Sequence, residues 1–134
     1  MRKGLFVAVL LLMAIGGSRP LLAQGFCPAE SQHAKVISGT TYSIGQADYC
    51  NVLTFTSASP VAATLPAPGT AGGYTLGYWV TVFMEGTGSL TVTPQANAAG
   101  VTPTINGLTT LTRASAGSAT IYVGTDGKYY ATLN

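Results

Sequence analysis

The side chains that could carry acid–base chemistry are few in this sequence and stand far apart. Beyond residue 23 there is one histidine, His33, and four carboxylates, Glu30, Asp48, Glu85 and Asp126. Catalysis needs an acid, a base, a nucleophile or a metal brought together, and the spacing of these groups indicates no such set. The sequence has no phosphate-binding glycine loop and no metal-ligand cluster. We therefore expect a protein that is not an enzyme and that uses no metal and no cofactor.

Cys27 and Cys50 are the only cysteines. A disulfide between them would close 22 intervening residues and contribute roughly 3 kcal/mol, mainly by restricting the unfolded chain. Two cysteines without histidine partners cannot form a structural zinc site. The alternative is two separate thiols, buried or unpaired.

The aromatic side chains are a better indication of function. Residues 74–84 alternate strictly, which predicts a strand with Tyr74, Leu76, Tyr78, Val80, Val82 and Met84 on its core face. Trp79, Thr81 and Phe83 share the other face and are the candidate binding face. Trp and Tyr on a sheet suit sugar rings and protein partners alike, because both offer flat apolar area with a polar edge. The alternative is that these rings fill the core of a small sandwich.

The elements that would position these residues are short β-strands. Beyond residue 39 the chain is a series of β-type segments separated by Gly, Pro, Asn and Asp. These segments are Thr41–Ile44, Val52–Thr56, Val61–Leu65, Tyr74–Met84, Ser89–Thr93, Thr102–Ile105, Leu108–Thr112, Ala119–Val123 and Lys128–Leu133. No segment supplies the crossover helices of parallel β-α-β units. The expected fold is all-β, an antiparallel β-sandwich or jelly-roll-like domain of about eight to nine short strands.

Two dipeptides predict tight turns. Asp126-Gly127 favours a type I′ turn, in which both residues need positive φ. A two-residue loop there would pair Gly124 with Tyr129, whose ring would cover the bare glycine backbone. Asn106-Gly107 separates the segments before and after it and is the second expected turn.

The beginning of the chain predicts export. Arg2 and Lys3 precede an unbroken apolar run of 11 residues, Leu5–Ile15, which is too short to cross a bilayer and fits the core of a secretory signal. We expect a signal peptide at 1–23, an N-terminal arm at 24–38 and the β-sandwich domain at 39–134. The alternative is an uncleaved N-terminal anchor. Export would place the protein in the periplasm or outside the cell, where disulfides persist.

Charge excludes one class of partner. The sequence has six basic and four acidic residues, and three of the basic ones, Arg2, Lys3 and Arg19, belong to the expected signal. The chain after cleavage would carry a net charge of about −1, with no cluster of cations to neutralise phosphates. We expect no nucleic-acid partner, and no membrane association once the signal is removed.

Threonine pairs occur at irregular intervals. Thr-x-Thr begins at Thr54, Thr91, Thr102 and Thr110, so the intervals are 37, 11 and 8 residues. A β-solenoid ice binder needs such pairs at one fixed period so that they stack into a flat rank. Alternating threonines on exposed strand faces are therefore the preferred interpretation.

The order of strand and turn segments along the chain resembles that of a short β domain of tailed-phage and prophage structural proteins. The segments that carry the resemblance are 39–44, 48–50, 53–59, 64–66, 80–82, 86–92, 104–107 and 125–130. It covers most of the chain beyond residue 39 and implies a non-catalytic β module of fibres or virion surfaces, often oligomeric. The signal peptide departs from that pattern, since virion components assemble in the cytoplasm.

Two functional hypotheses follow. The first is an exported structural or adhesion-type module, phage-fibre-like, whose partner is a second copy of the chain. The second is a carbohydrate- or receptor-binding domain that uses the aromatic face to hold a glycan or a cell-surface receptor. The environment of Trp79 and Phe83 distinguishes them, because an assembly would bury these rings and a glycan site would leave them open.

Overall fold

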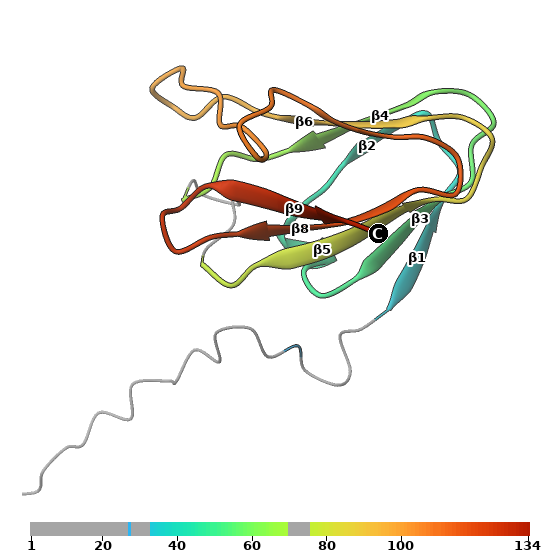
Figure 1. Ribbon diagram of the computed structural model, residues 1–134, viewed down its shortest axis with the longest axis horizontal. Coiled ribbons are helices and arrows are strands. Elements are labelled where there is room, and N and C mark those ends of the chain that lie inside the picture. The colour runs from blue at the N-terminus through green and yellow to red at the C-terminus, as the bar shows by residue number, and fades with distance from the viewer. Residues whose placement is uncertain (1–26, 28–32, 70–75) are drawn as a thin grey trace, which may run out of the picture.

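The computed structural model describes residues 27, 33–69 and 76–134, which form two β-sheets packed face to face (Figure 1). Sheet A has the strand order β1-β3-β5-β8-β9, and sheet B has the order β2-β4-β6-β7. The elements are β1 (Ala34–Ile37), β2 (Thr41–Ser43), the 3₁₀ turn η1 (Gln46–Asp48), β3 (Val52–Phe55), β4 (Val61–Leu65), β5 (Trp79–Met84), β6 (Leu90–Pro94), β7 (Leu111–Arg113), β8 (Ser118–Val123) and β9 (Tyr129–Leu133). The expected all-β sandwich is confirmed.

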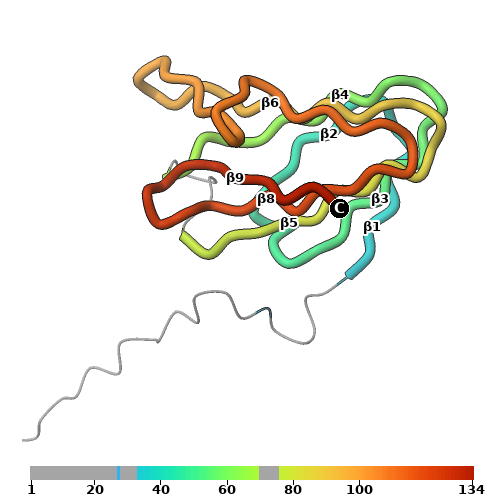
Figure 2. The backbone as a smooth tube through the Cα atoms, in the orientation of Figure 1, coloured from blue at the N-terminus to red at the C-terminus, as the bar shows by residue number. Residues whose placement is uncertain are grey.

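The first six strands alternate between the two sheets. β1, β3 and β5 run parallel in sheet A, and β2, β4 and β6 run parallel in sheet B. The chain thus winds as three coils of a flattened β-solenoid, which the tube in Figure 2 follows from layer to layer. The expectation of an antiparallel or jelly-roll-like sandwich is wrong for these strands. No crossover helix is needed, because the connection between two parallel strands is itself a strand of the opposite sheet.

The last three strands close the winding with antiparallel pairs. β7 pairs with β6, β8 pairs with β5, and β9 pairs with β8. The stretch 102–105 is not a strand as predicted and contributes only bridges at Ile105. Sheet A begins at Ala34, inside the segment 24–38 that was expected to be an arm. The expected signal peptide, 1–23, lies outside the described residues.

The core lies between the sheets and follows the predicted alternation of β5. Val80, Val82 and Met84 are fully buried, and Tyr78 just before the strand is 4% exposed. Leu76 is 43% exposed, so its placement on the core face is wrong. The reason is that β5 begins at Trp79, so the two-residue period does not extend back to Leu76. Tyr74 lies outside the described residues.

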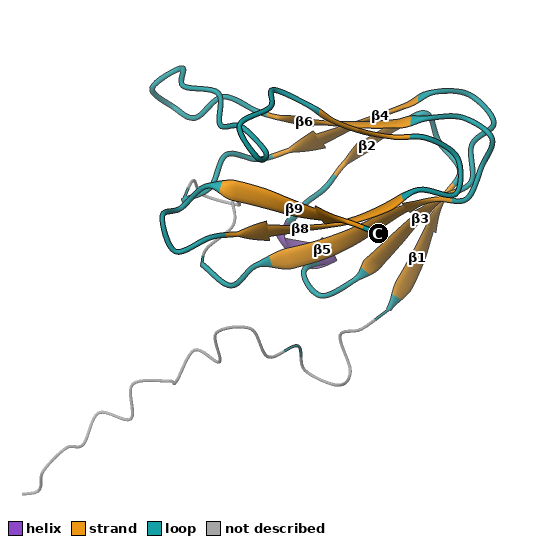
Figure 3. Cartoon of the chain, in the orientation of Figure 1, coloured by secondary structure: helices purple, strands orange, loops and turns teal. Residues whose placement is uncertain are grey.

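The loops that lead from sheet A to sheet B after β3 and β5 lie together at one end of the layers (right in Figure 3). The loop after β5 lies against the loop after β3, where the Gly86 backbone N–H donates to the Phe55 carbonyl at 3.0 Å and that of Gly88 to the Ser57 carbonyl at 3.2 Å. A Cβ at Gly86 would lie 2.1 Å from the Ser57 carbonyl oxygen. Only glycine permits this approach between neighbouring coils.

The terminal hairpin differs from its prediction by one residue. Gly127 has a φ of 73°, but Asp126 does not have a positive φ, so the type I′ turn is wrong. The Gly127 N–H donates to the Gly124 carbonyl at 3.0 Å, and the loop is one residue longer than expected. Val123 therefore pairs with Tyr129. A shift of one residue exchanges the faces of a strand, so Tyr129 is buried and Tyr130 covers Gly124 instead.

The second expected turn is formed and protects an edge of sheet A. Asn106 and Gly107 have φ values of 52° and 80°, the left-handed pair that a type I′ turn needs. The Asn106 side chain donates to the Ala131 carbonyl at 2.8 Å and accepts from the Ala131 N–H at 3.0 Å. These bonds satisfy backbone groups on the outer edge of β9, which would otherwise be open to another strand.

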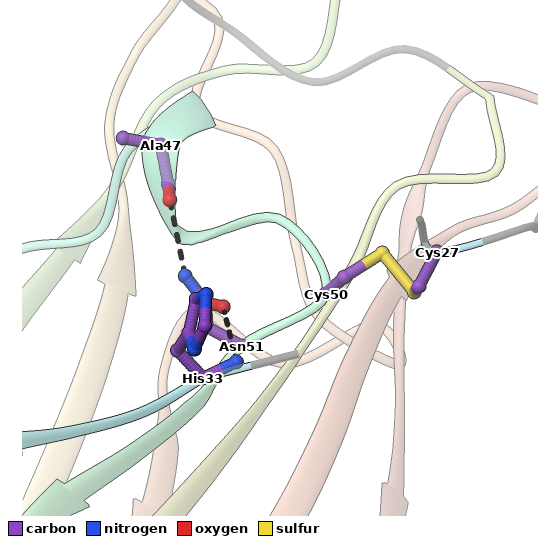
Figure 4. The surroundings of a disulfide bond; sticks show 5 residues. All are labelled: Cys27, His33, Ala47, Cys50 and Asn51. Atoms are coloured by element: carbon purple, nitrogen blue, oxygen red, sulfur yellow. Dashed lines mark hydrogen bonds between the residues drawn. A yellow bond between two sulfur atoms is a disulfide. The ribbon is translucent and has the colours of Figure 1, made fainter. Parts of the chain in front are cut away.

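The predicted Cys27–Cys50 disulfide is confirmed, with Cα atoms 5.6 Å apart (Figure 4). Next to it, the Asn51 side chain accepts from the His33 N–H at 3.1 Å and donates to the Ala47 carbonyl at 3.1 Å. The Cys50 N–H donates to the Trp79 carbonyl at 3.0 Å. The disulfide thus holds Cys27 beside the residue that bonds to the beginning of β5. Such a bridge fits an oxidising, exported environment.

Candidate functional site

A row of three aromatic side chains crosses the outer face of sheet A. Trp79 on β5 pairs with Tyr122 on β8, and Tyr122 pairs with Tyr130 on β9. The two tyrosine rings are stacked, with centroids 5.8 Å apart and planes 24° apart. Tyr122 is exposed, and the other two side chains are half-buried. We call these three residues the aromatic row. Cross-strand neighbours of this kind hold one another in place and present a flat apolar surface.

All three residues of the predicted binding face lie on this outer face, but the structure separates them. Trp79, Thr81 and Phe83 are half-buried and point away from the core residues Val80 and Val82. Trp79 belongs to the aromatic row, and Thr81 lies next to it. Phe83 pairs with the residues of another row, Thr54 and Ser118, and does not reach the aromatic row.

Two shallow depressions adjoin the aromatic row, and Tyr122 lines both. The first is lined by Trp79, Thr81, Thr120 and Tyr122. The Thr81 and Thr120 hydroxyls lie 3.0 Å apart and share a hydrogen bond. The second lies toward the β8–β9 turn and is lined by Leu76, Gly77, Tyr122, Val123, Gly124, Thr125, Asp126 and Tyr130. The site therefore combines aromatic faces, hydroxyl groups and one carboxylate.

The carboxylate of Asp126 is held in place by its own turn. It accepts hydrogen bonds from the Tyr130 hydroxyl at 3.0 Å and the Lys128 N–H at 3.2 Å, and it forms an ion pair with the Lys128 ammonium at 3.2 Å. Partial desolvation raises the pKa of Asp126, but these hydrogen bonds and the lysine charge together hold it below its ordinary value. The hydrogen bond to Asp126 raises the pKa of Tyr130. At neutral pH the second depression therefore contains a charged hydrogen-bond acceptor, the Asp126 carboxylate, beside the neutral hydroxyl of Tyr130.

The predicted binding face did not include Tyr122 and Tyr130, although both are aromatic residues of predicted strands, and Asp126 was expected only as a turn residue. The two-residue period of β8 places Ala119, Ile121 and Val123 inside and Tyr122 outside, so the orientation of Tyr122 was predictable. Its position beside Trp79 was not, because that depends on the pairing of β5 with β8. The turn residues Asp126 and Gly127 were expected only to shape the hairpin, and Asn106 and Gly107 form the turn that bonds to β9.

A second polar cluster has a structural explanation. Asp48, only 3% exposed, accepts from the Tyr42 hydroxyl at 2.9 Å, the Gly45 N–H at 2.9 Å and the Lys35 ammonium at 3.2 Å. Lys35 also donates to the Tyr42 hydroxyl at 2.5 Å. These contacts join β1, β2 and η1, so the cluster ties the first coil together.

This cluster predicts a loss of stability at alkaline pH. The hydrogen bond to Tyr42 and the Asp48 charge raise the pKa of Lys35 above 10.5, and burial raises the pKa of Tyr42 above 10.0. Folding therefore favours the protonated form of both groups. Their contribution is complete below about pH 10 and is lost as the pH rises through the folded-state pKa values.

We expect the thermal unfolding midpoint to fall above about pH 10, measured by circular dichroism. The Tyr42→Phe variant, which loses the phenol and its bonds to Lys35 and Asp48, should start lower and fall less over the same range. Parallel curves for the two proteins would contradict this account of the cluster.

The described part of the chain holds no group of three His, Cys, Asp or Glu side chains that could bind a metal ion. Within the same residues, no helix has the length and apolar character needed to span a membrane. The sequence matches no protein-family model, no curated protein and no solved structure.

Proposed function

We propose that the protein is a non-catalytic, exported β module of the adhesion type, which binds glycans through the aromatic row. The observation that carries this proposal is the side-by-side placement of Trp79, Tyr122 and Tyr130 on an accessible face of sheet A. Sugar rings carry a face of C–H groups that packs on aromatic rings, while their hydroxyls seek acceptors and donors at the edge. The Asp126 carboxylate and the Thr81 and Thr120 hydroxyls supply those groups at the two ends of the row.

The shape of the site favours an extended glycan over a small metabolite. Small-molecule sites are deep and enclose most of their ligand. Here two shallow depressions share Tyr122 as a common side, so neighbouring sugar units of one chain could occupy them in succession. The Asp126 end recognises hydroxyls through charge-assisted hydrogen bonds, which are stronger than neutral ones.

Self-assembly is the second candidate function, and a separate observation favours it. At the β1 side of the same outer face, Val36 is 68% exposed and Val52 is 38% exposed. Exposed apolar side chains on a chain of low charge offer little resistance to association. A fibre-like module would cover these valines with a second copy.

The glycan proposal predicts that Trp79→Ala abolishes tight binding while the domain stays folded. Removing an aromatic anchor of a binding site costs about 2 kcal/mol or more, about thirtyfold in affinity. Glycan-array screening of the exported protein identifies a ligand, and titration of tryptophan fluorescence measures its affinity. Trp79 is the only tryptophan in the chain, so its emission reports this site alone.

Phe83→Ala is the matched control, because Phe83 shares the outer face but lines neither depression. It should bind as the unchanged protein does. Equal losses in both variants would contradict the aromatic row as the site. Absence of any glycan ligand, combined with association that weakens in Val36→Ser, would support self-assembly instead.

A further inference from the structure

The outer face of sheet B has an unusual composition. Seven side chains of its four strands point away from the core, and every one is threonine, serine or alanine. They are Thr41, Ser43, Ala62, Thr64, Thr91, Thr93 and Thr112. Five of the seven are exposed and two are half-buried. No charged and no aromatic side chain interrupts this set, which we call the hydroxyl face.

These side chains form two ranks that run across the strands. Thr41, Ala62, Thr91 and Thr112 lie in register in the first rank, and Ser43, Thr64 and Thr93 lie in register in the second. The Thr64 hydroxyl donates to the Ser43 hydroxyl at 3.3 Å, so these two neighbours in the second rank are in hydrogen-bond contact. The irregular Thr-x-Thr intervals in the sequence do not prevent this order. The coils differ in length, and backbone pairing rather than sequence spacing sets the register.

The ranks give a repeating pattern in two directions. Neighbouring parallel strands lie about 4.8 Å apart, and every second residue along a strand repeats at about 6.6 Å. The spacing between strands is close to the shorter oxygen repeat on the prism faces of hexagonal ice, and the spacing along a strand is somewhat shorter than the longer repeat. Each threonine presents a hydroxyl that bonds water and a methyl group beside it. An ordered array of this kind can hold a layer of water in ice-like positions.

We propose that the hydroxyl face of sheet B binds the surface of ice. Its chemistry complements that occupant, because ice is an uncharged lattice of hydrogen-bond donors and acceptors, and the face is uncharged with a hydroxyl on six of its seven side chains. The face contains no aromatic ring on which a sugar could stack, unlike the aromatic row on sheet A. It also has none of the large aromatic or arginine anchors that protein interfaces use. The proposal is independent of glycan binding, which uses the opposite side of the sandwich.

The test measures thermal hysteresis and ice-crystal shape with the exported, disulfide-bonded protein. The unchanged protein should shape single ice crystals and delay their growth below the melting point. Thr91 lies in the middle of the first rank, between Ala62 and Thr112, so Thr91→Tyr breaks the flat surface and should remove most of the hysteresis. Thr132→Tyr is the matched control, because Thr132 is exposed on sheet A, and it should retain full activity.

Circular dichroism melting shows that each variant is folded, and Thr91→Val gives a second test that keeps the shape of the side chain. A smaller loss of thermal hysteresis in Thr91→Val than in Thr91→Tyr would show that the flat shape of the hydroxyl face is needed for binding to ice. Absence of hysteresis and of ice shaping in the unchanged protein would overturn the proposal. Equal loss in Thr91→Tyr and Thr132→Tyr would also overturn it, as would binding to insoluble chitin or cellulose through this face without binding to ice.

Discussion

Val82→Asp should leave the protein unfolded. Val82 is fully buried in β5, the middle strand of sheet A, with Leu53 on β3 and Ala119 on β8 as its register neighbours. Both neighbours are also fully buried and apolar. A carboxylate there would lose its hydration without gaining a partner, a penalty of several kcal/mol that is comparable to the whole stability of a small domain.

Val52→Asp is the matched control for this substitution. Val52 lies on β3 in the same sheet but points outward and is 38% exposed, so its aspartate stays hydrated. Circular dichroism and resistance to proteolysis of both variants measure the outcome. A folded Val82→Asp variant with a normal melting temperature would show that this side of β5 does not face the core.

The second large effect is expected at Gly86, where one methyl group should destabilise the fold by about 3 kcal/mol or more. The added Cβ would come within 2.1 Å of the Ser57 carbonyl oxygen and 2.6 Å of the Thr56 carbonyl carbon. These are backbone atoms of the neighbouring coil, and they cannot rotate aside as a side chain could. The stacked loops must separate, which strains the hydrogen bond from Gly86 to Phe55.

Gly45→Ala provides the comparison, because nothing lies within 4 Å of its added Cβ and its φ is −130°, which any residue adopts. Urea unfolding of both variants gives the difference in stability. We expect a large loss for Gly86→Ala and a change of less than about 0.5 kcal/mol for Gly45→Ala. Similar values for the two would mean that the coils do not stack as described.

Local patterns predicted the strands well. The segment Val61–Leu65 was predicted with its observed bounds, and the burial of Val80, Val82 and Met84 followed from alternation alone. β1 was missed because its four residues carry no period that separates them from a polar arm. The face of Tyr129 was also missed, because it depends on a single residue of loop length in the last hairpin.

The sequence did not predict which strands pair or in which direction they run. The residues of β1 and β3 do not indicate that these strands are parallel, because any strand with one apolar face can pair in either direction. The same limit applied to the site. Trp79 was predicted to point outward, but its neighbour Tyr122 comes from a strand about forty residues later and is brought there by the winding of the chain. The hydroxyl face was hidden for the same reason.

The Cys27–Cys50 disulfide also determines how the molecule would carry mechanical load. A pulling force applied ahead of Cys27 and at the C-terminus passes through the covalent bridge directly to Cys50 and then to β3. β1, β2 and η1 lie between the two cysteines, so they form a side loop that bears no tension. The length released by forced unfolding should therefore lack residues 28–49 until a reductant is added. An adhesion module under flow would keep its first coil out of the line of force.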